Sequence, residues 1–110
     1  MNPKIISRKI KYKGIWADIE EEKIKLPDGK VLKWESIISS DAVAVVALDD
    51  KQNIYLSKEW RPVWEEEILQ IPAGMCKGKT EKEILKQASN ELREEIGVDA
   101  KKWQKLITFF

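Results

Sequence analysis

Residues 90–98, with the sequence NELREEIGV, place three carboxylates in the last turns of a predicted helix. The helix dipole leaves about half a negative charge at this end, and like charges three or four residues apart repel one another. The carboxylates of Glu91, Glu94 and Glu95 should therefore cost stability unless a cation lies among them. The stretch predicts a site for a divalent metal ion at the end of the helix.

The helix itself is predicted over about residues 81–96. Thr80 followed by Glu83 forms a capping box at its start, and Gly97 provides a residue that readily ends it. Apolar residues recur at helical spacing on one stripe that should pack on a core, namely Ile84, Leu85, Ala88, Leu92 and Ile96. Glu95 falls inside this stripe, which favours a role other than plain solvation.

A second interpretation of the acidic helix is a solvated face whose charge is neutralised by nearby basic side chains. The cations available for this are Lys82, Lys86, Arg93 and Lys101. The two interpretations differ in a measurable way, because a salt-bridged surface predicts no stabilisation by Mg²⁺.

The composition restricts the chemistry of a metal site. The 110 residues include no histidine and one cysteine, Cys76, which excludes imidazole ligands, histidine-based triads, thiolate zinc clusters and an internal disulfide. Any metal must be bound by oxygen atoms, which favours Mg²⁺ or Mn²⁺ over zinc or copper. Cys76 is expected to be a free thiol in a reducing compartment.

Charge and hydropathy exclude two classes of partner. A net charge of +1, from 20 basic and 19 acidic residues, gives no field that attracts nucleic acid, so none is expected as a partner. No apolar run approaches the length of a membrane span, and the first residues lack the apolar region of a signal peptide. A small cytoplasmic protein with no membrane partner is expected.

Before the helix the sequence predicts mainly strands. Extended patterning covers about residues 4–12, 15–26, 31–38, 54–60 and 67–71. The turn at residues 27–29, Pro-Asp-Gly, favours a hairpin, and the continuously apolar residues 42–48 are typical of a central strand buried on both faces. These patterns predict an α+β chain with an N-terminal antiparallel sheet over residues 1–40 and a second part over 41–110.

Residues 70–74, QIPAG, followed by a short loop and the acidic helix, resemble the motif of Nudix hydrolases. Within that family the chain looks like the ADP-ribose pyrophosphatase group, whose members carry a strand ending in ELPAG and a helix closing on RExxEExG. Residues 59–62, EWRP, are similar to a QYRP segment common in the group. The resemblance spans nearly the whole chain and implies an apolar strand at residues 105–110.

The resemblance implies a Nudix-type α/β/α sandwich with a mixed sheet. Residues 1–40 would form the N-terminal antiparallel sheet for dimerisation and substrate contact, and residues 41–110 a partial Nudix domain. Family members continue past the position of Phe110, so the C-terminal part of the fold is expected to be missing. Asn90 stands where the family has an arginine that holds the glutamates, and Gly74 lies two residues farther from Glu91 than in the family, which implies an insertion in the Cys76 to Glu83 loop.

The resemblance further implies Mg²⁺-dependent hydrolysis of a nucleoside diphosphate sugar, with ADP-ribose giving AMP and ribose 5-phosphate. The implied catalytic and metal-binding residues are Glu91, Glu94 and Glu95, with the carbonyl oxygen of Ala73 as a further metal ligand. A second hypothesis is a truncated Nudix-like nucleotide-binding domain that is catalytically weak or inactive, which Asn90, the longer loop and the missing C-terminal part favour.

Two further residues are implied in substrate binding. Arg61 resembles a diphosphate-binding arginine, whose fork of donors suits phosphate oxygens, with a surface ion pair to Glu59 or Glu65 as the alternative. Trp16 resembles an aromatic residue that stacks on adenine across a dimer, with ordinary packing as the alternative. In this group the N-terminal sheet mediates a homodimer, and the resemblance implies the same assembly here.

Overall fold

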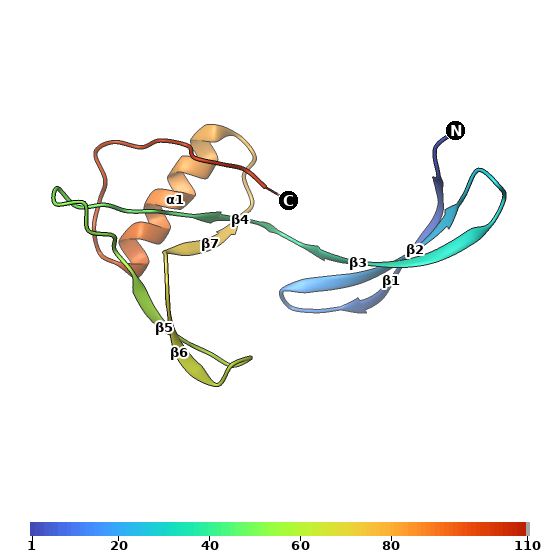
Figure 1. The fold of residues 1–110 in the computed structure, drawn as a ribbon, viewed down its shortest axis with the longest axis horizontal. Helices are drawn as coiled ribbons and strands as arrows, with labels where there is room; N and C mark the ends of the chain where they lie inside the picture. The colour runs from blue at the N-terminus through green and yellow to red at the C-terminus, as the bar shows by residue number, and fades with distance from the viewer. Residues whose placement is uncertain (110) are drawn as a thin grey trace. The chain divides into compact units, whose positions relative to one another are not determined.

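The computed structural model describes residues 1–109 and divides the chain into two compact units, Met1–Ser40 and a unit that begins at Asp41 (Figure 1). The first unit is a three-stranded antiparallel sheet in the order β1-β2-β3. Its strands are β1 (Lys4–Lys13), β2 (Ala17–Lys25) and β3 (Val31–Ser39). The predicted N-terminal antiparallel sheet is confirmed.

The turn between β2 and β3 forms as the sequence predicted. Gly29 has a φ of +88°, and its N–H donates to the carbonyl of Leu26 at 2.9 Å. The Lys30 N–H donates to the side chain of Asp28 at 3.0 Å. A positive φ strains residues with a Cβ but not glycine, so the Pro-Asp-Gly pattern specifies this hairpin locally.

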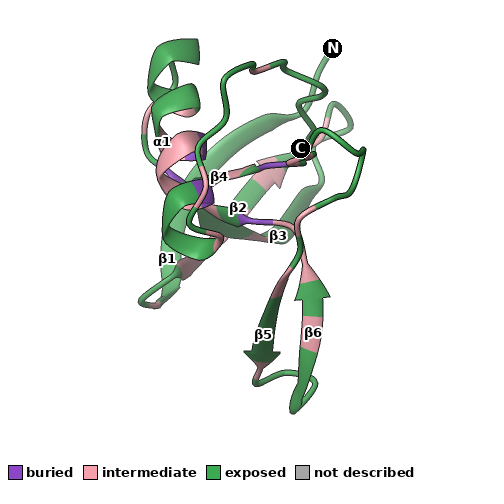
Figure 2. Ribbon diagram, turned by 90° about the vertical axis from the view of Figure 1, so that its left-hand side faces the viewer, coloured by how far each residue is buried: buried purple, intermediate pink, exposed green. Residues whose placement is uncertain are grey.

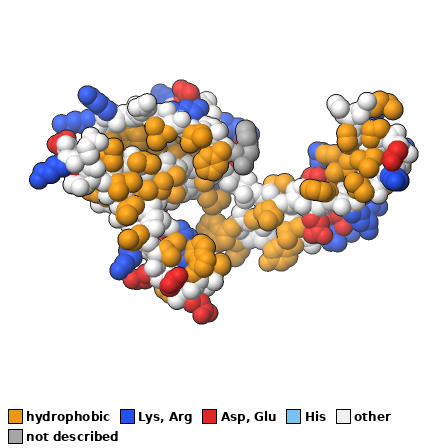
Figure 3. Space-filling view, in the orientation of Figure 1, with side chains coloured by type: hydrophobic (Ala, Val, Ile, Leu, Met, Phe, Trp, Pro, Cys, Tyr) orange, Lys and Arg blue, Asp and Glu red, His pale blue; other side chains and the backbone are white. Residues whose placement is uncertain are grey.

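One face of this sheet carries a set of apolar side chains. The strand register places on that face Ile5, Ile10, Ile24, Leu32, Trp34 and Ile38, and these six residues are called the apolar sheet face. None of residues 1–40, all of which the structure describes, is buried within the chain (Figure 2). Hydrophobic side chains are visible on the surface of both units (Figure 3).

The second unit combines two short sheets with one helix. β4 (Asp41–Ala44) pairs antiparallel with β7 (Ala73–Cys76), and β5 (Ser57–Arg61) forms a hairpin with β6 (Glu66–Gln70). The helix α1 (Glu81–Glu95) contacts β4 and β7. No helix within residues 1–109 is long and apolar enough to cross a membrane.

The apolar run at residues 42–48 does not form a strand buried on both faces, and this prediction is wrong. β4 ends at Ala44, and of the run only Val45 is buried. The Val45 N–H donates to the carbonyl of Pro72 at 2.8 Å. Because proline has no backbone N–H, it cannot donate a second hydrogen bond to Val45, and the ladder between β4 and β7 stops at this pair.

Two other strand predictions need correction, and one strand was missed. The strand expected at 54–60 begins only at Ser57, after an isolated bridge between Leu48 and Ile54. Residues 105–109 form no strand, since an extended segment becomes one only when a neighbouring strand pairs with it, and Phe110 lies outside the described residues. β7 was not expected, because Ala73–Cys76 lacks the β-branched residues that favour strands.

The helix begins and ends where the sequence predicted, to within one residue. The Thr80 hydroxyl accepts from the Glu83 N–H at 3.2 Å and donates to the Glu83 carboxylate at 2.8 Å. At the other end, the Gly97 N–H donates to the carbonyl of Arg93 at 2.9 Å. Both ends are therefore specified by side chains and backbone within a few residues of the helix.

The buried core of the second unit is small and lies where α1 faces β4 (Figure 2). Its buried members are Val45, Ala88 and Leu92, and the partly buried residues packed against them are Val43, Ala47, Ile96, Val98 and Trp103. Leu92 is only 1% exposed. This residue fixes the face of α1 that turns toward the strands, and so fixes which acids can reach β7.

The substitution Leu92→Ala is expected to destabilise the second unit by about 3 kcal/mol, because it removes buried apolar area and leaves a cavity. Leu85→Ala is the matched control on the same helix, since Leu85 is 43% exposed and should lose less than about 1 kcal/mol. Urea unfolding followed by tryptophan fluorescence measures both. Equal losses for the two variants would contradict the assignment of Leu92 to the core.

Candidate functional site

The C-terminal end of α1 is joined to the start of β7 by a hydrogen bond. The backbone N–H of Ala73 donates to Glu95 Oε2 at 3.2 Å. Ala73 follows the buried Pro72, at the point where the chain passes from β6 into β7. Glu95, which the sequence placed on the apolar stripe of the helix, therefore faces the strand junction that carries the QIPAG motif.

Glu91 lies against the same junction one helical turn earlier. A Cβ added at Gly74 would overlap the Glu91 carboxylate, so this carboxylate occupies the space that a larger residue would fill. On its other side, Gln87 Nε2 donates to Glu91 Oε1 at 2.8 Å. Gly74 thus allows the Glu91 carboxylate to approach the backbone of β7, and Gln87 restrains it there.

Partial burial raises the pKa of the Glu95 carboxyl, although the residue as a whole is exposed. The negative charges of Glu91 and Glu59 raise it further, while the Ala73 N–H and the Arg61 guanidinium act in the opposite direction. The net shift is upward. The ionised form of Glu95 is thus disfavoured at this junction, as expected where negative charge is not fully compensated.

This raised pKa gives stability a defined pH dependence. The contribution of Glu95 to folding is complete below its ordinary pKa of 4.5 and is lost as the pH rises through the raised value. In EDTA, Glu95→Gln should therefore melt at a higher temperature than the parent near neutral pH, and the difference should vanish by about pH 4. Melting curves of both proteins, recorded between about pH 4 and neutral pH, test the sign of this difference in melting temperature. A variant less stable than the parent at neutral pH would contradict it.

Arg61 belongs to a polar network that runs along the β5–β6 hairpin. Arg61 Nη2 donates to Gln70 Oε1 at 2.8 Å and pairs with Glu59 Oε2 at 3.1 Å, and Gln70 Nε2 also donates to Glu59. The ion pair with Glu59, one of the alternatives drawn from the sequence, is present. Gln70 and Glu59 were not predicted as site residues, although their positions on facing strands of one hairpin were the available signal.

The structure brings together two of the three predicted acids. Glu91 and Glu95 both face the β6–β7 junction, whereas Glu94 lies about 100° around the helix from Glu95. Within residues 1–109, no three acidic, histidine or cysteine side chains lie close enough together to hold a metal ion. Trp16 lies in the first unit, between β1 and β2, and is 73% exposed.

The side chains at the junction are chemically suited to a hard divalent cation. Glu91 and Glu95 offer carboxylate oxygens, and Ala73 adds a backbone carbonyl, with no softer ligand among them. Partial burial is the main cause of the raised pKa of Glu95, and the negative charge of Glu91 adds to it; a cation between the two carboxylates would relieve this second contribution. The oxygen donors at this place therefore fit Mg²⁺ or Mn²⁺, with two carboxylates in position.

Comparison with known proteins gives consistent matches. The chain is 36% identical over 110 residues to the ADP-ribose pyrophosphatase of Bacillus subtilis, covering 100% of this chain and 58% of that protein. It is 31% identical over 102 residues to the ADP-ribose pyrophosphatase of Mycobacterium tuberculosis, covering 93% and 49% respectively. No family model matches the chain. The chain thus spans about half the length of the curated relatives it matches.

A solved structure described as an ADP compounds hydrolase has the same fold. The TM-score is 0.78 at 21% sequence identity, and the match covers 93% of this chain and 55% of the other. The match confirms an α+β fold with an N-terminal antiparallel sheet and one C-terminal helix over that part. Of the α/β/α sandwich with a mixed sheet that the resemblance implied, residues 1–109 contain α1 and separate antiparallel sheets.

Proposed function

We propose, from the confirmed resemblance of this chain to the ADP-ribose pyrophosphatases of the Nudix family, that it takes part in hydrolysing a nucleoside diphosphate sugar. The proposed substrate is ADP-ribose, which with one water gives AMP and ribose 5-phosphate. The observation that carries the proposal is the convergence of Glu91 and Glu95 on the backbone of Ala73 and Gly74. The names of the two relatives support the choice of substrate.

We propose that Glu91, Glu95 and the carbonyl of Ala73 hold Mg²⁺, or Mn²⁺ in its place. Glu94, which directly precedes Glu95, is proposed as a further ligand. When bound, the cation would neutralise diphosphate charge and lower the pKa of a water molecule. The protein's own contribution is to place two carboxylates, held by Gln87 and the Ala73 N–H, where the substrate phosphates would lie.

Arg61 is proposed to bind the diphosphate. Within residues 1–109, its Nε and Nη2 donate to Gln70 Oε1 at 3.3 and 2.8 Å, and Nη2 also pairs with Glu59 Oε2 at 3.1 Å. The two donors on Nη1 are therefore available for phosphate oxygens. Arg61 also lowers the pKa of Glu95 slightly, which is the direction expected from a positive charge on the same side of the unit. Gln70 and Glu59 would orient the guanidinium before the substrate arrives.

The first unit is proposed to form a homodimer interface in a cytoplasmic protein. The apolar sheet face includes Trp34 and five aliphatic residues, and all of its side chains except that of the half-buried Ile24 are exposed. Exposed apolar side chains gathered on one sheet face are typical of an interaction site, and the register places Arg8, Glu20 and Glu22 on the same face. The exposed Trp16 offers an aromatic face on which adenine could stack. Sedimentation of the parent and of Trp34→Glu tests the assembly, which should dissociate in the variant.

The activity is tested by incubating the chain with ADP-ribose and separating the products. AMP and ribose 5-phosphate should appear in equal amounts with Mg²⁺ and not with EDTA. GDP-mannose serves as the competing substrate. Absence of metal-dependent AMP release would overturn the proposed hydrolysis.

A nucleotide-binding domain without turnover is the second candidate. It is favoured by Asn90 at the arginine position and by a chain that spans about half of its relatives. Calorimetric titration with ADP-ribose separates the two candidates, because this domain would bind the nucleotide and release no AMP.

A further inference from the structure

Gln87 is placed to control the position of a carboxylate that it precedes by one helical turn. Its amide Nε2 donates to Glu91 Oε1 at 2.8 Å, and both side chains are partly buried. Residues four apart lie on the same side of a helix, so the bond forms without distorting the backbone. A hydrogen bond to a charged carboxylate is stronger than one between neutral groups.

The carboxylate is confined on its other side by the backbone of β7. The space beside Gly74 that a Cβ would need is filled by the Glu91 carboxylate. Glu91 is thus held between a strand that carries no side chain at that position and an amide donor on its own helix. Neither the Gln87 amide nor the Gly74 backbone carries a positive charge. These two contacts therefore do not neutralise the carboxylate, which can still attract a cation.

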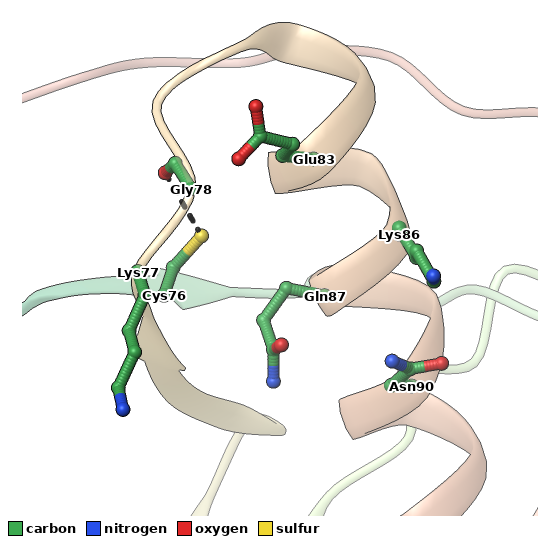
Figure 4. A pocket seen from close by; sticks show the side chains of 7 residues that line it. All are labelled: Cys76, Lys77, Gly78, Glu83, Lys86, Gln87 and Asn90. Atoms are coloured by element: carbon green, nitrogen blue, oxygen red, sulfur yellow. Dashed lines mark hydrogen bonds between the residues drawn. The ribbon is translucent and has the colours of Figure 1, made fainter.

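Asn90, directly before Glu91, does not share this role. It lines a pocket of about 360 Å³ together with Gln87, Lys86 and Cys76. In Figure 4 the Gln87 side chain lies in the space between α1 and β7, while that of Asn90 stays beside the helix. Among residues 1–109, the side-chain donor recorded for Glu91 is that of Gln87.

We infer that Gln87 is the residue that positions the Glu91 carboxylate. It does so through a neutral amide, and Asn90, which directly precedes Glu91, makes no such hydrogen bond within residues 1–109. The inference rests on the proposed function, because it assigns a task within the same site. It requires two properties of Gln87. Its hydrogen bond must persist in the protein without metal, and its loss must weaken metal binding without unfolding the helix.

The first test is metal binding without nucleotide. Mn²⁺ is titrated calorimetrically into the parent, Gln87→Leu and the matched control Lys86→Leu. Lys86 lines the same pocket on the same helix, and leucine keeps the helix propensity in both variants. Gln87→Leu should weaken Mn²⁺ binding about 10-fold, as is usual for loss of a residue that orients a ligand. An affinity equal to that of Lys86→Leu would overturn the inference.

The second test needs no metal and no activity. The side-chain amide signals of Gln87 are assigned in the NMR spectrum as the signals that disappear in the Gln87→Leu variant. Their chemical shifts are then measured in the Glu91→Leu variant and in the control variant Glu94→Leu. The signals should move in Glu91→Leu and stay in place in Glu94→Leu. Signals unchanged in Glu91→Leu would overturn the inference whatever the titration shows.

The two tests also separate this inference from the proposed function. A parent chain that binds no Mn²⁺ but shows the coupling of Gln87 to Glu91 would contradict the metal site while supporting the positioning of the carboxylate. A parent that binds Mn²⁺ without that coupling would support the metal site and contradict the role of Gln87.

Discussion

Replacing Glu95 by glutamine is expected to reduce metal-dependent AMP release about a thousandfold. Stabilisation of developing charge by a bound cation is worth several kcal/mol, and each 1.4 kcal/mol corresponds to a factor of ten in rate. Glutamine keeps the size of the side chain and an oxygen that can accept from the Ala73 N–H. The substitution therefore removes the charge and leaves the junction of α1 and β7 in place.

The measurement is the initial rate of AMP release at saturating Mg²⁺, with melting temperatures recorded in parallel. Glu81→Gln provides the matched control, because Glu81 lies in the first turn of the same helix and pairs only loosely with Lys105, at 3.9 Å. That variant should keep the parent rate. A Glu95→Gln variant with the parent rate would remove this residue from the proposed site.

Gly74→Ala is expected to lower the rate about a hundredfold with little loss of stability. The added Cβ would take the space of the Glu91 carboxylate, which is the far end of a flexible side chain and can move aside. Gly74 does not have a positive φ, so alanine fits its backbone conformation. A catalytic group displaced by about 1 Å can cost about 10²-fold in rate.

Gly78→Ala is the control for this effect, because its Cβ also meets a glutamate side chain, that of Glu83. Glu83 contributes to the N-terminal cap of α1 through Thr80 and lies outside the proposed site. Gly78→Ala should therefore cost more stability than Gly74→Ala, because its Cβ also meets the Glu83 Cβ, which moves only with the backbone, while the rate of the folded protein stays close to that of the parent. Urea unfolding and the AMP assay measure the two effects, and a rate loss equal to that of Gly74→Ala would contradict the role of Glu91.

The features predicted well are those that depend on neighbours in the sequence. The cap at Thr80, the end at Gly97 and the turn at Gly29 each require groups only a few residues apart, and each was found where expected. The strand β7 was missed for the opposite reason. Its residues pair with β4, some thirty positions earlier, and their own composition does not favour a strand.

The site divides in the same way. Helical periodicity placed Glu95 on the face turned toward the protein, and the structure agrees, but three-dimensional contacts decide what it meets there. The network of Glu59, Arg61 and Gln70 depends on the pairing of two strands, which no local pattern specifies. Gln87 at a spacing of four from Glu91 was recognisable in the sequence, but nothing marked it as more than an ordinary polar residue.

The sequence by itself determined the helix with its two ends, the hairpin turn at Gly29, the oxygen-only chemistry of any metal site, and the resemblance to ADP-ribose pyrophosphatases. These depend on local geometry and on which residue types are present. Tertiary structure alone decided that β4 stops opposite Pro72, that Glu91 and Glu95 meet β7, and that Gln87 holds Glu91. The reason is that a carboxylate's position follows from the core residue Leu92, whose packing sets the rotation of α1 against the strands.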